Sequence, residues 1–496
     1  MTTNLAFWDE DLPPETPEEQ YQTLVRSLRR RQGFGLLFVR CSPADGELLV
    51  EQVKQDLPQK DIETLQLDQP IQNLYDIVAE LPHPEKINIL FIEGLEYSLY
   101  QYEAEKLQQG WETGETYAYS MKGVPLILGH LNLHRERFRD DFNICFVFLL
   151  RSFALKYFIH RAPDFFDWRS AEFKIPLDQK RWEQESFKIL EEGDYEQYLS
   201  LAPQEQAKKL LEIEELLTAE HPAPSDRASL WLEQGILLHA ARKYEGSIAS
   251  YDQAVKFKPD FHQAWYNRGV SLYNLGRYEA AIVSYDQAVN IKPDFHEAWY
   301  NRGISLRKLG RDEAAIASYD QAVNIKPDKH EAWNNRGNSL RKLGRYEAAI
   351  ASYDQAVNIK PDLYPAWYNQ GISLDQLGRY EAAIASYDQA VKFKPDYHEV
   401  WYDRGISLYN LGRYEAAIVS YDQAVNIKPD YHKAWYNKAC CYALQNQVEL
   451  ALENLQQAIK LNPEEYLEMA KTDSDFDKIW SDERFQTLLR DEAAIH

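Results

Sequence analysis

The sequence predicts an N-terminal α/β domain with a mostly parallel sheet, followed by an all-α superhelix of repeated helix pairs. A tryptophan recurs every 34 residues from Trp231 to Trp435, and this fixed period indicates units that each stack on their neighbours. Between residues 16 and 150, short apolar runs alternate with amphipathic segments, as buried strands separated by helices do. A charged helical region joins the two parts.

The α/β domain is expected over residues 1–176. Thr16 is a helix-capping residue, Pro17 suits the first helical position and Glu19 completes a capping box, so a helix is predicted from here to about Arg31. Apolar runs predict strands, and the segments between them predict helices over residues 44–55 and 71–81. The predicted strands cover residues 35–40, 62–67, 87–92, 125–128 and 144–150.

The rest of the chain divides into three predicted parts. Residues 177–227 form a helical connector, with helices over 183–192 and 204–217 and a Pro-containing linker at residues 221–225. Seven repeats occupy residues 228–465, and a charged capping helix follows over residues 466–496.

Each repeat contains two apolar-periodic segments and a glycine turn between them, for example Leu275-Gly276-Arg277. Counted from residues 228, 262, 296, 330, 364, 398 and 432, position four is Trp, eight is Gly, twenty is Ala, twenty-four is Tyr and thirty-two is Pro, with departures only in the first and last repeats. This pattern resembles the tetratricopeptide repeat (TPR). The resemblance implies a superhelix of helix pairs whose concave groove, made mainly by each first helix, binds a peptide or protein segment.

The resemblance also implies that positions two, five, six, nine, twelve and thirteen face that groove. Tyrosine recurs at position five and asparagine at position six, and an asparagine amide can pair with the backbone of an extended peptide. The third and fourth repeats place arginine and lysine at positions twelve and thirteen. The predicted ligand-binding residues are Tyr266, Asn267, Tyr300, Asn301, Arg307, Lys308, Asn334, Asn335, Asn338, Arg341, Lys342, Tyr368, Asn369 and Tyr402.

The basic segment of the third and fourth repeats predicts a partner with an acidic group, held by charge-assisted hydrogen bonds. The alternative is that these cations only stabilise the carboxyl ends of their helices. Arginines at position seven, such as Arg302, are expected to form structural ion pairs with aspartates at position twenty-five, such as Asp286.

Segments within residues 16–176 resemble signal-transduction NTPases of the STAND/AAA class, including residues 131–136 and 162–169. The phosphate-binding glycine loop is missing, because Cys41-Ser42-Pro43-Ala44-Asp45 follows the first strand and carries an acid instead. The domain is therefore expected to be a degenerate, P-loop-NTPase-like regulatory domain. A divergent nucleotide-dependent switch is the alternative function, and a self-assembling scaffold is a second alternative.

The composition excludes several classes of function. The net charge is −23, which disfavours binding to nucleic acid or anionic lipid, and no apolar stretch is long enough to span a bilayer. The four cysteines lack metal-ligand spacing, and no catalytic constellation is evident. We therefore expect a cytoplasmic, non-enzymatic scaffold or signalling adaptor that uses no cofactor and no metal. The sequence leaves its oligomeric state open.

Overall fold

The structure is a computed structural model that describes residues 16–108, 124–175, 179–218 and 223–491. The predicted N-terminal lead lies outside these residues, as do residues 219–222 of the predicted linker. The chain forms two compact units, Met1–Leu275 and Gly276–His496, and the boundary falls between the two helices of the second repeat. Each unit is described by itself.

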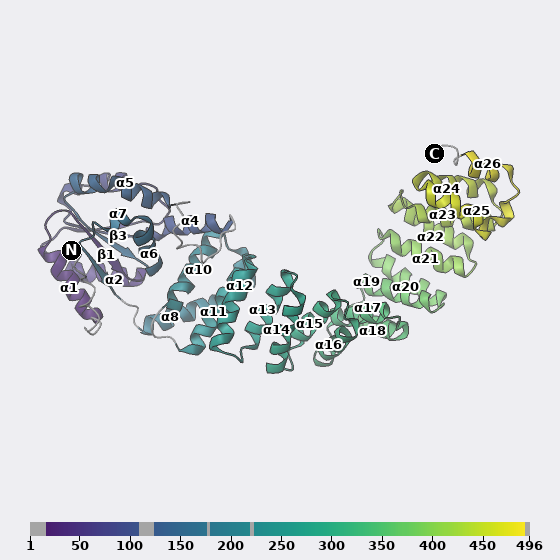
Figure 1. The fold of residues 1–496 in the computed structure, drawn as a ribbon, viewed down its shortest axis with the longest axis horizontal. Coiled ribbons are helices and arrows are strands. Elements are labelled where there is room, and N and C mark those ends of the chain that lie inside the picture. The colour runs from purple at the N-terminus through teal and green to yellow at the C-terminus, as the bar shows by residue number, and fades with distance from the viewer. Residues whose placement is uncertain (1–15, 109–123, 176–178, 219–222, 492–496) are drawn as a thin grey trace, which may run out of the picture. The chain divides into compact units, whose positions relative to one another are not determined.

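The first unit begins with a five-stranded parallel sheet in the order β2-β3-β4-β1-β5, as the sequence predicts in outline. Leu36 and Phe38 of β1 pack into one apolar core, and Leu37 and Val39 pack into the other. Helices therefore cover both faces, with α5 and α7 on one side and α1 and α2 on the other (Figure 1). The strands are β1 (Gly35–Arg40), β2 (Ile62–Gln66), β3 (Ile89–Glu93), β4 (Cys145–Leu150) and β5 (Ala171–Lys174).

The helices around the sheet largely follow the sequence. Thr16 and Glu19 form the expected capping box at the start of α1. The predicted strand at residues 125–128 is wrong, because Leu126 begins α5, and the apolar residues there are the first turn of a long helix. The helices are α1 (Pro17–Arg30), α2 (Pro43–Asp56), α3 (Leu74–Ala79), α4 (Glu96–Gln108), α5 (Leu126–Asp141), α6 (Ser152–Arg161) and α7 (Pro163–Phe166), with a short 3₁₀ turn η1 (Pro84–Lys86).

The connector is part of the first repeat's packing. It consists of α8 (Gln179–Glu192), α9 (Tyr195–Ser200) and α10 (Pro203–Thr218). Trp182 and Leu210 of the connector share an apolar core with Leu230 and Leu237 of the first repeat. The predicted linker ends earlier than expected, because Pro224 occupies the first turn of α11, where proline is well tolerated.

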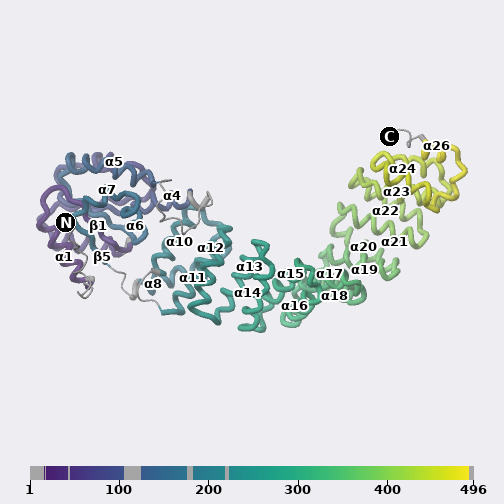
Figure 2. The backbone as a smooth tube through the Cα atoms, in the orientation of Figure 1, coloured from purple at the N-terminus to yellow at the C-terminus, as the bar shows by residue number. Residues whose placement is uncertain are grey.

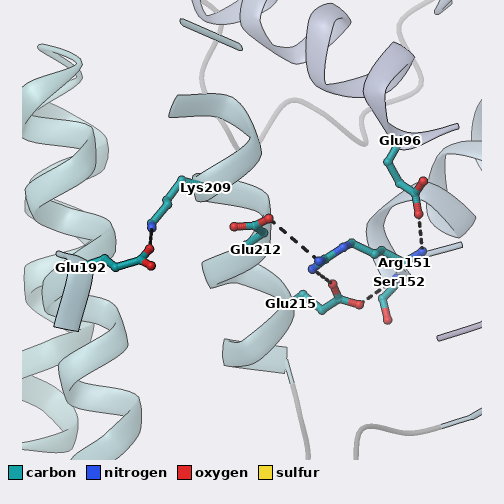
Figure 3. Close-up of polar contacts among 7 residues, drawn as sticks. All are labelled: Glu96, Arg151, Ser152, Glu192, Lys209, Glu212 and Glu215. Carbon is teal, nitrogen blue, oxygen red and sulfur yellow. Dashed lines mark hydrogen bonds and ion pairs between the residues drawn. The ribbon is translucent and has the colours of Figure 1, made fainter. Parts of the chain in front are cut away.

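One arginine joins the connector to the sheet. Arg151, directly after β4, places a guanidinium nitrogen 3.0 Å from Glu215 of α10 and another 3.9 Å from Glu212 (Figure 3). The N–H of Ser152 donates to Glu215 at 3.2 Å, and the buried Glu96 carboxylate accepts the N–H of Arg151 at 3.2 Å. The contacts fix α10 beside the carboxyl end of the sheet.

The repeats form successive helix pairs, which can be followed along the tube in Figure 2. First helices are α11 (Pro224–Ala240), α13 (His262–Asn274), α15 (His296–Lys308), α17 (His330–Lys342), α19 (Tyr364–Gln376), α21 (His398–Asn410) and α23 (His432–Leu444). Second helices are α12 (Tyr244–Phe257), α14 (Tyr278–Ile291), α16 (Asp312–Ile325), α18 (Tyr346–Ile359), α20 (Tyr380–Phe393), α22 (Tyr414–Ile427) and α24 (Val448–Leu461).

The recurring positions explain how the helices of a repeat pack, as the third repeat shows. Ala315, Tyr319 and Ala322 lie on one face of α16 and are completely buried. A Cβ added to Gly303, at position eight, would lie 2.6 Å from the Tyr319 ring, so only glycine allows this approach. The turn between the helices needs a left-handed backbone, which Gly310 supplies at φ +72°. Each tryptophan from Trp265 to Trp435 ties its repeat to the preceding one, as in the Trp333 indole N–H donating to the Pro327 carbonyl at 2.9 Å.

After the seventh repeat the chain forms α25 (Pro463–Thr472), the 3₁₀ segment η3 (Ser474–Ile479) and α26 (Glu483–Asp491). The predicted capping segment is thus two helices with a bend between them. Phe476 and Phe485 are completely buried against the last repeat, so this segment covers the apolar end of the stack.

Candidate functional site

The predicted groove residues all lie on first helices of the repeats. We call the surface formed by positions five, six, nine, twelve and thirteen of these helices the first-helix face. Tyr266 and Asn267 lie on α13, in the first unit. The others lie in the second unit, on α15 (Tyr300, Asn301, Arg307, Lys308), α17 (Asn334, Asn335, Asn338, Arg341, Lys342), α19 (Tyr368, Asn369) and α21 (Tyr402).

Tyrosines at position five contact position six of the following repeat. The Asn335 side chain donates to the Tyr300 hydroxyl at 3.1 Å, and Asn437 donates to the Tyr402 hydroxyl at 3.2 Å. Where aspartate replaces asparagine, the Tyr368 hydroxyl donates to Asp403 at 2.8 Å. Part of the hydrogen-bonding capacity of this row is therefore used between repeats.

The fourth repeat breaks this pattern, because its position five is Asn334. The side-chain oxygen of Asn334 is buried and has no hydrogen-bond partner among the described residues. At position nine, the Asn338 oxygen accepts a hydrogen bond from the Tyr353 hydroxyl at 2.9 Å, which leaves its NH₂ group as a donor. This repeat therefore combines an unsatisfied acceptor and an available donor on the first-helix face.

Arg307 and Arg341 occupy position twelve of the third and fourth repeats. Neither guanidinium pairs with a carboxylate of the residues that the structure describes, and the Nε atom of each is buried without a partner. Both approach a buried tyrosine: burial raises the pKa of Tyr319 and the charge of Arg307 opposes this, and Arg341 has the same effect on the pKa of Tyr353. Neither arginine is therefore neutralised by a carboxylate of the described residues.

The two lysines at position thirteen differ from each other. Lys308 is exposed, whereas the Lys342 ammonium lies 2.8 Å from Asp312, whose side chain is only 2% exposed. Asp312 stands where most repeats have a tyrosine at the start of the second helix. Lys342 therefore neutralises a buried carboxylate, a contact that sequence reasoning missed although the substitution at residue 312 signals it.

Two aspartates follow the arginines along the first-helix face. Burial raises the pKa of Asp403 to about 6, against the lowering effect of the Tyr368 hydrogen bond. Burial also raises the pKa of Asp375, which accepts hydrogen bonds of 2.6 Å from both Ser407 and Tyr387. The face thus changes from basic in the third and fourth repeats to acidic in the fifth and sixth.

The ion pairs expected at positions seven and twenty-five are confirmed. Arg302 and Asp286 are 2.6 Å apart, and Arg404 and Asp388 are 2.7 Å apart, with equivalent pairs in other repeats. Each of these arginines links the first helix of its repeat to the second helix of the preceding repeat and is part of the scaffold.

A separate cavity of about 310 Å³ lies in the first unit at the carboxyl ends of β1, β3 and β4. Ligands of open parallel sheets bind in such a place, where strand order reverses. Here the Asp45 carboxylate accepts a hydrogen bond from Ser42 at 2.7 Å and so occupies the amino end of α2. Glu47 and Glu93 also line the cavity, and burial raises the pKa of Glu93. These carboxylates disfavour a phosphate at the amino end of α2, although Arg151 and Lys208 also line the cavity.

Among the described residues, no helix is both long and apolar enough to cross a membrane.

Comparisons with known proteins identify the repeats. Tetratricopeptide repeat models match residues 336–398, 368–432 and 432–465, and a TPR repeat model matches residues 236–276, 271–310 and 305–340. No curated protein matches the chain.

Several solved structures are similar to part of the chain. A crystal structure of MamA is 20% identical, with 35% of this chain and 94% of that chain covered and a TM-score of 0.34. YrrB, described as a TPR protein with an unusual peptide-binding site, is 23% identical, with 38% and 97% covered and a TM-score of 0.35. The C-terminal part of a repeat protein from Cytophaga hutchinsonii is 15% identical, with 50% and 99% covered and a TM-score of 0.42.

The family models, the position-by-position pattern and the helix pairs agree with one another. Residues 236–465 of this chain are therefore tetratricopeptide repeats, in an all-α array that follows a parallel α/β domain.

Proposed function

We propose that this protein is a non-enzymatic scaffold or adaptor whose repeats bind an extended segment of a partner protein along the first-helix face. An acidic group of that segment is received by Arg307 and Arg341, beside Asn334 and Asn338. One observation carries this proposal: two arginines with buried, unpartnered Nε atoms lie on the ligand-facing positions of an acidic protein. Desolvated guanidinium groups bind carboxylates more strongly than exposed ones do.

The proposal separates the cations into two groups. Arg307 and Arg341 contact the ligand directly, and Lys308 adds an exposed charge beside them. Lys342 holds Asp312 and contributes mainly by keeping that carboxylate neutralised. The tyrosine–asparagine pairs on either side keep the first helices in register and present the remaining amide groups to the ligand backbone.

Selection of random displayed peptides on the full-length protein tests this function. The wild-type chain should enrich Asp- and Glu-containing peptides, and their binding should weaken as salt rises from 50 to 500 mM, on the order of several-fold. The double substitution Arg307→Ala/Arg341→Ala should abolish the enrichment. Arg311→Ala/Arg345→Ala removes the same charge from exposed turn positions and is the matched control. Equal enrichment by both variants would refute the proposal.

We further propose that residues 1–176 form a degenerate NTPase-like domain that docks or regulates and does not hydrolyse nucleotide. Support comes from Asp45 at the amino end of α2 and from the carboxylates of Glu47 and Glu93 in the adjacent cavity, which repel phosphate. Calorimetry of the full chain with ATP and with GTP, each with and without magnesium, should give no binding heat. Micromolar binding in any of these titrations would favour the nucleotide-dependent switch.

A further inference from the structure

The segment after the seventh repeat places two of its carboxylates on the first-helix face. Tyr436 donates from its hydroxyl to Asp473 at 2.8 Å, and the Tyr409 hydroxyl donates to Asp475. The Cys440 sulfur lies 3.8 Å from the same Asp473 carboxylate. Cys440, Asp473 and Asp475 are close enough to suggest a cation site, but the tyrosine hydroxyls already donate to both carboxylates. The chain therefore shows how its own repeats hold an acidic Asp-x-Asp segment.

Because the repeats have a 34-residue period, the positions that hold the tail can be compared with the same positions in other repeats. The groups that hold the two carboxylates are position twelve of one repeat (Tyr409) and positions five and nine of the next (Tyr436 and Cys440). Three repeats earlier the same positions are Arg307, Asn334 and Asn338, and two repeats earlier they are Arg341, Tyr368 and Ile372. A guanidinium thus replaces the tyrosine hydroxyl that holds Asp475, and its hydrogen bonds to a carboxylate are stronger.

Of these two repeat junctions, the one between the third and fourth repeats offers more hydrogen-bond donors to an acidic segment. Arg307 can donate to one carboxylate, and the NH₂ group of Asn338 is available to the other because Tyr353 already occupies its oxygen. The buried oxygen of Asn334 lacks a donor, which a backbone N–H of the bound segment can supply.

The junction between the fifth and sixth repeats has the opposite charge. Position twelve of the fifth repeat is Asp375, which is held by Ser407 and Tyr387 and lies near Asp403. A further carboxylate there would be repelled, so the acidic segment does not extend into the fifth and sixth repeats.

We propose that the ligand of the first-helix face is a segment with two aspartates one residue apart, Asp-x-Asp, bound across the third and fourth repeats. If the ligand binds as residues 473–475 do, Arg307 binds the second aspartate. Asn338 then binds the carboxylate of the first aspartate, and Asn334 accepts a hydrogen bond from its backbone N–H. This inference rests on the proposed function and names its ligand class. The chain's own residues 473–475 are the internal example of such a segment.

Fluorescence anisotropy with labelled peptides tests the proposal on the full-length protein. The probe is a peptide with the sequence of residues 471–479 in which Asp477 is replaced by asparagine, so that Asp473 and Asp475 form its only Asp-x-Asp pair. Its comparison peptides carry Asp473→Asn/Asp475→Asn, or the same residues with Ser474 moved to make the two aspartates adjacent. The protein variants are Arg307→Ala, the turn control Arg311→Ala, and Tyr409→Phe/Tyr436→Phe, which weakens the chain's own tail contact.

The probe should bind the wild type, and the double-asparagine peptide should bind about 10- to 100-fold more weakly. Arg307→Ala should cause a loss of the same order, whereas Arg311→Ala should have no effect. If only Tyr409→Phe/Tyr436→Phe weakened binding, the peptide would be replacing the tail and the proposed site would be wrong. Equal affinity for the adjacent-aspartate peptide would refute the Asp-x-Asp spacing but would still agree with the proposed binding of an acidic segment. If acidic peptides of every spacing failed to bind, both proposals would be refuted.

Discussion

Replacing Asp403 by asparagine should stabilise the protein at neutral pH. Asp403 is the one member of the position-six row in the third to seventh repeats that is not asparagine, and its carboxylate is held by the Tyr368 hydroxyl at 2.8 Å. Asparagine keeps an acceptor for that hydroxyl without the charge. The same exchange restores the pattern of the neighbouring repeats, where Asn437 pairs with Tyr402.

The size of the effect follows from the pKa of Asp403, which burial raises from 3.8 to about 6. The folded state then binds a proton more tightly than the unfolded state, so stability is fully present below pH 3.8 and falls as pH rises through 6. One pKa unit corresponds to about 1.4 kcal/mol, so ionised Asp403 costs at most about 3 kcal/mol above pH 7. Local relaxation around the tyrosine makes about 1–3 kcal/mol the expected gain.

Thermal unfolding followed by tryptophan fluorescence at several pH values between 4 and 8 measures this gain. For a unit of this size, Asp403→Asn should raise the midpoint by about 3–8 °C at pH 8, and the difference should vanish towards pH 4. Asp328→Asn, an exposed aspartate in a turn between repeats, is the control and should have little effect at any pH. A lower midpoint for Asp403→Asn at pH 8, or a pH dependence equal to that of the wild type, would refute the reasoning.

Three further substitutions test the packing. Gly337→Ala places a Cβ 2.5 Å from the Tyr353 ring and should lower the free energy of unfolding by about 1–3 kcal/mol, measured with denaturant. Gly129→Ala, in a helix with open space around it, is the control and should be neutral or stabilising. Equal effects of the two substitutions would contradict this packing. Arg242 has φ +59° where the second to sixth repeats have glycine, so Arg242→Gly should raise the melting temperature by relieving about 1 kcal/mol of strain, and a lower melting temperature would count against it. Arg151→Ala leaves the partly buried Glu212 and Glu215 of α10 without their cation and should cost about 1.5–3 kcal/mol, seen as faster proteolysis of the connector. Unchanged proteolysis would show that α10 is held by apolar packing alone.

The regular parts of the fold could be predicted because their signals are periodic. The run at residues 35–40 is a buried parallel strand, and such strands are apolar on both faces. The run at residues 125–128 is equally apolar but starts a helix, because four residues do not distinguish the two periods. The edge strand β5 alternates Ala171, Glu172, Phe173 and Lys174 and is too short and polar to stand out.

Contacts in the candidate site could likewise be predicted only where they follow the repeat. The pairing of Arg302 with Asp286 could be predicted, since two fixed positions of a repeat always meet in the same way. The pairing of Lys342 with Asp312 could not be predicted in this way, because Asp312 departs from the repeat pattern and only three-dimensional packing shows that Lys342 reaches it. Asp473 caps the 3₁₀ segment η3 and Asp475 lies in it, beyond the last regular repeat, so the 34-residue period does not predict their contacts.

The covered ends of the repeat stack limit how copies of the protein can join. A stack of like repeats has two complementary open ends, and head-to-tail contact between such ends can propagate into filaments. Here the connector buries Leu230 and Leu237 at one end, and α25, η3 and α26 bury their own apolar residues against the last repeat at the other. Deleting both covers should therefore expose two complementary apolar ends and allow end-to-end addition, which light scattering would detect as larger species.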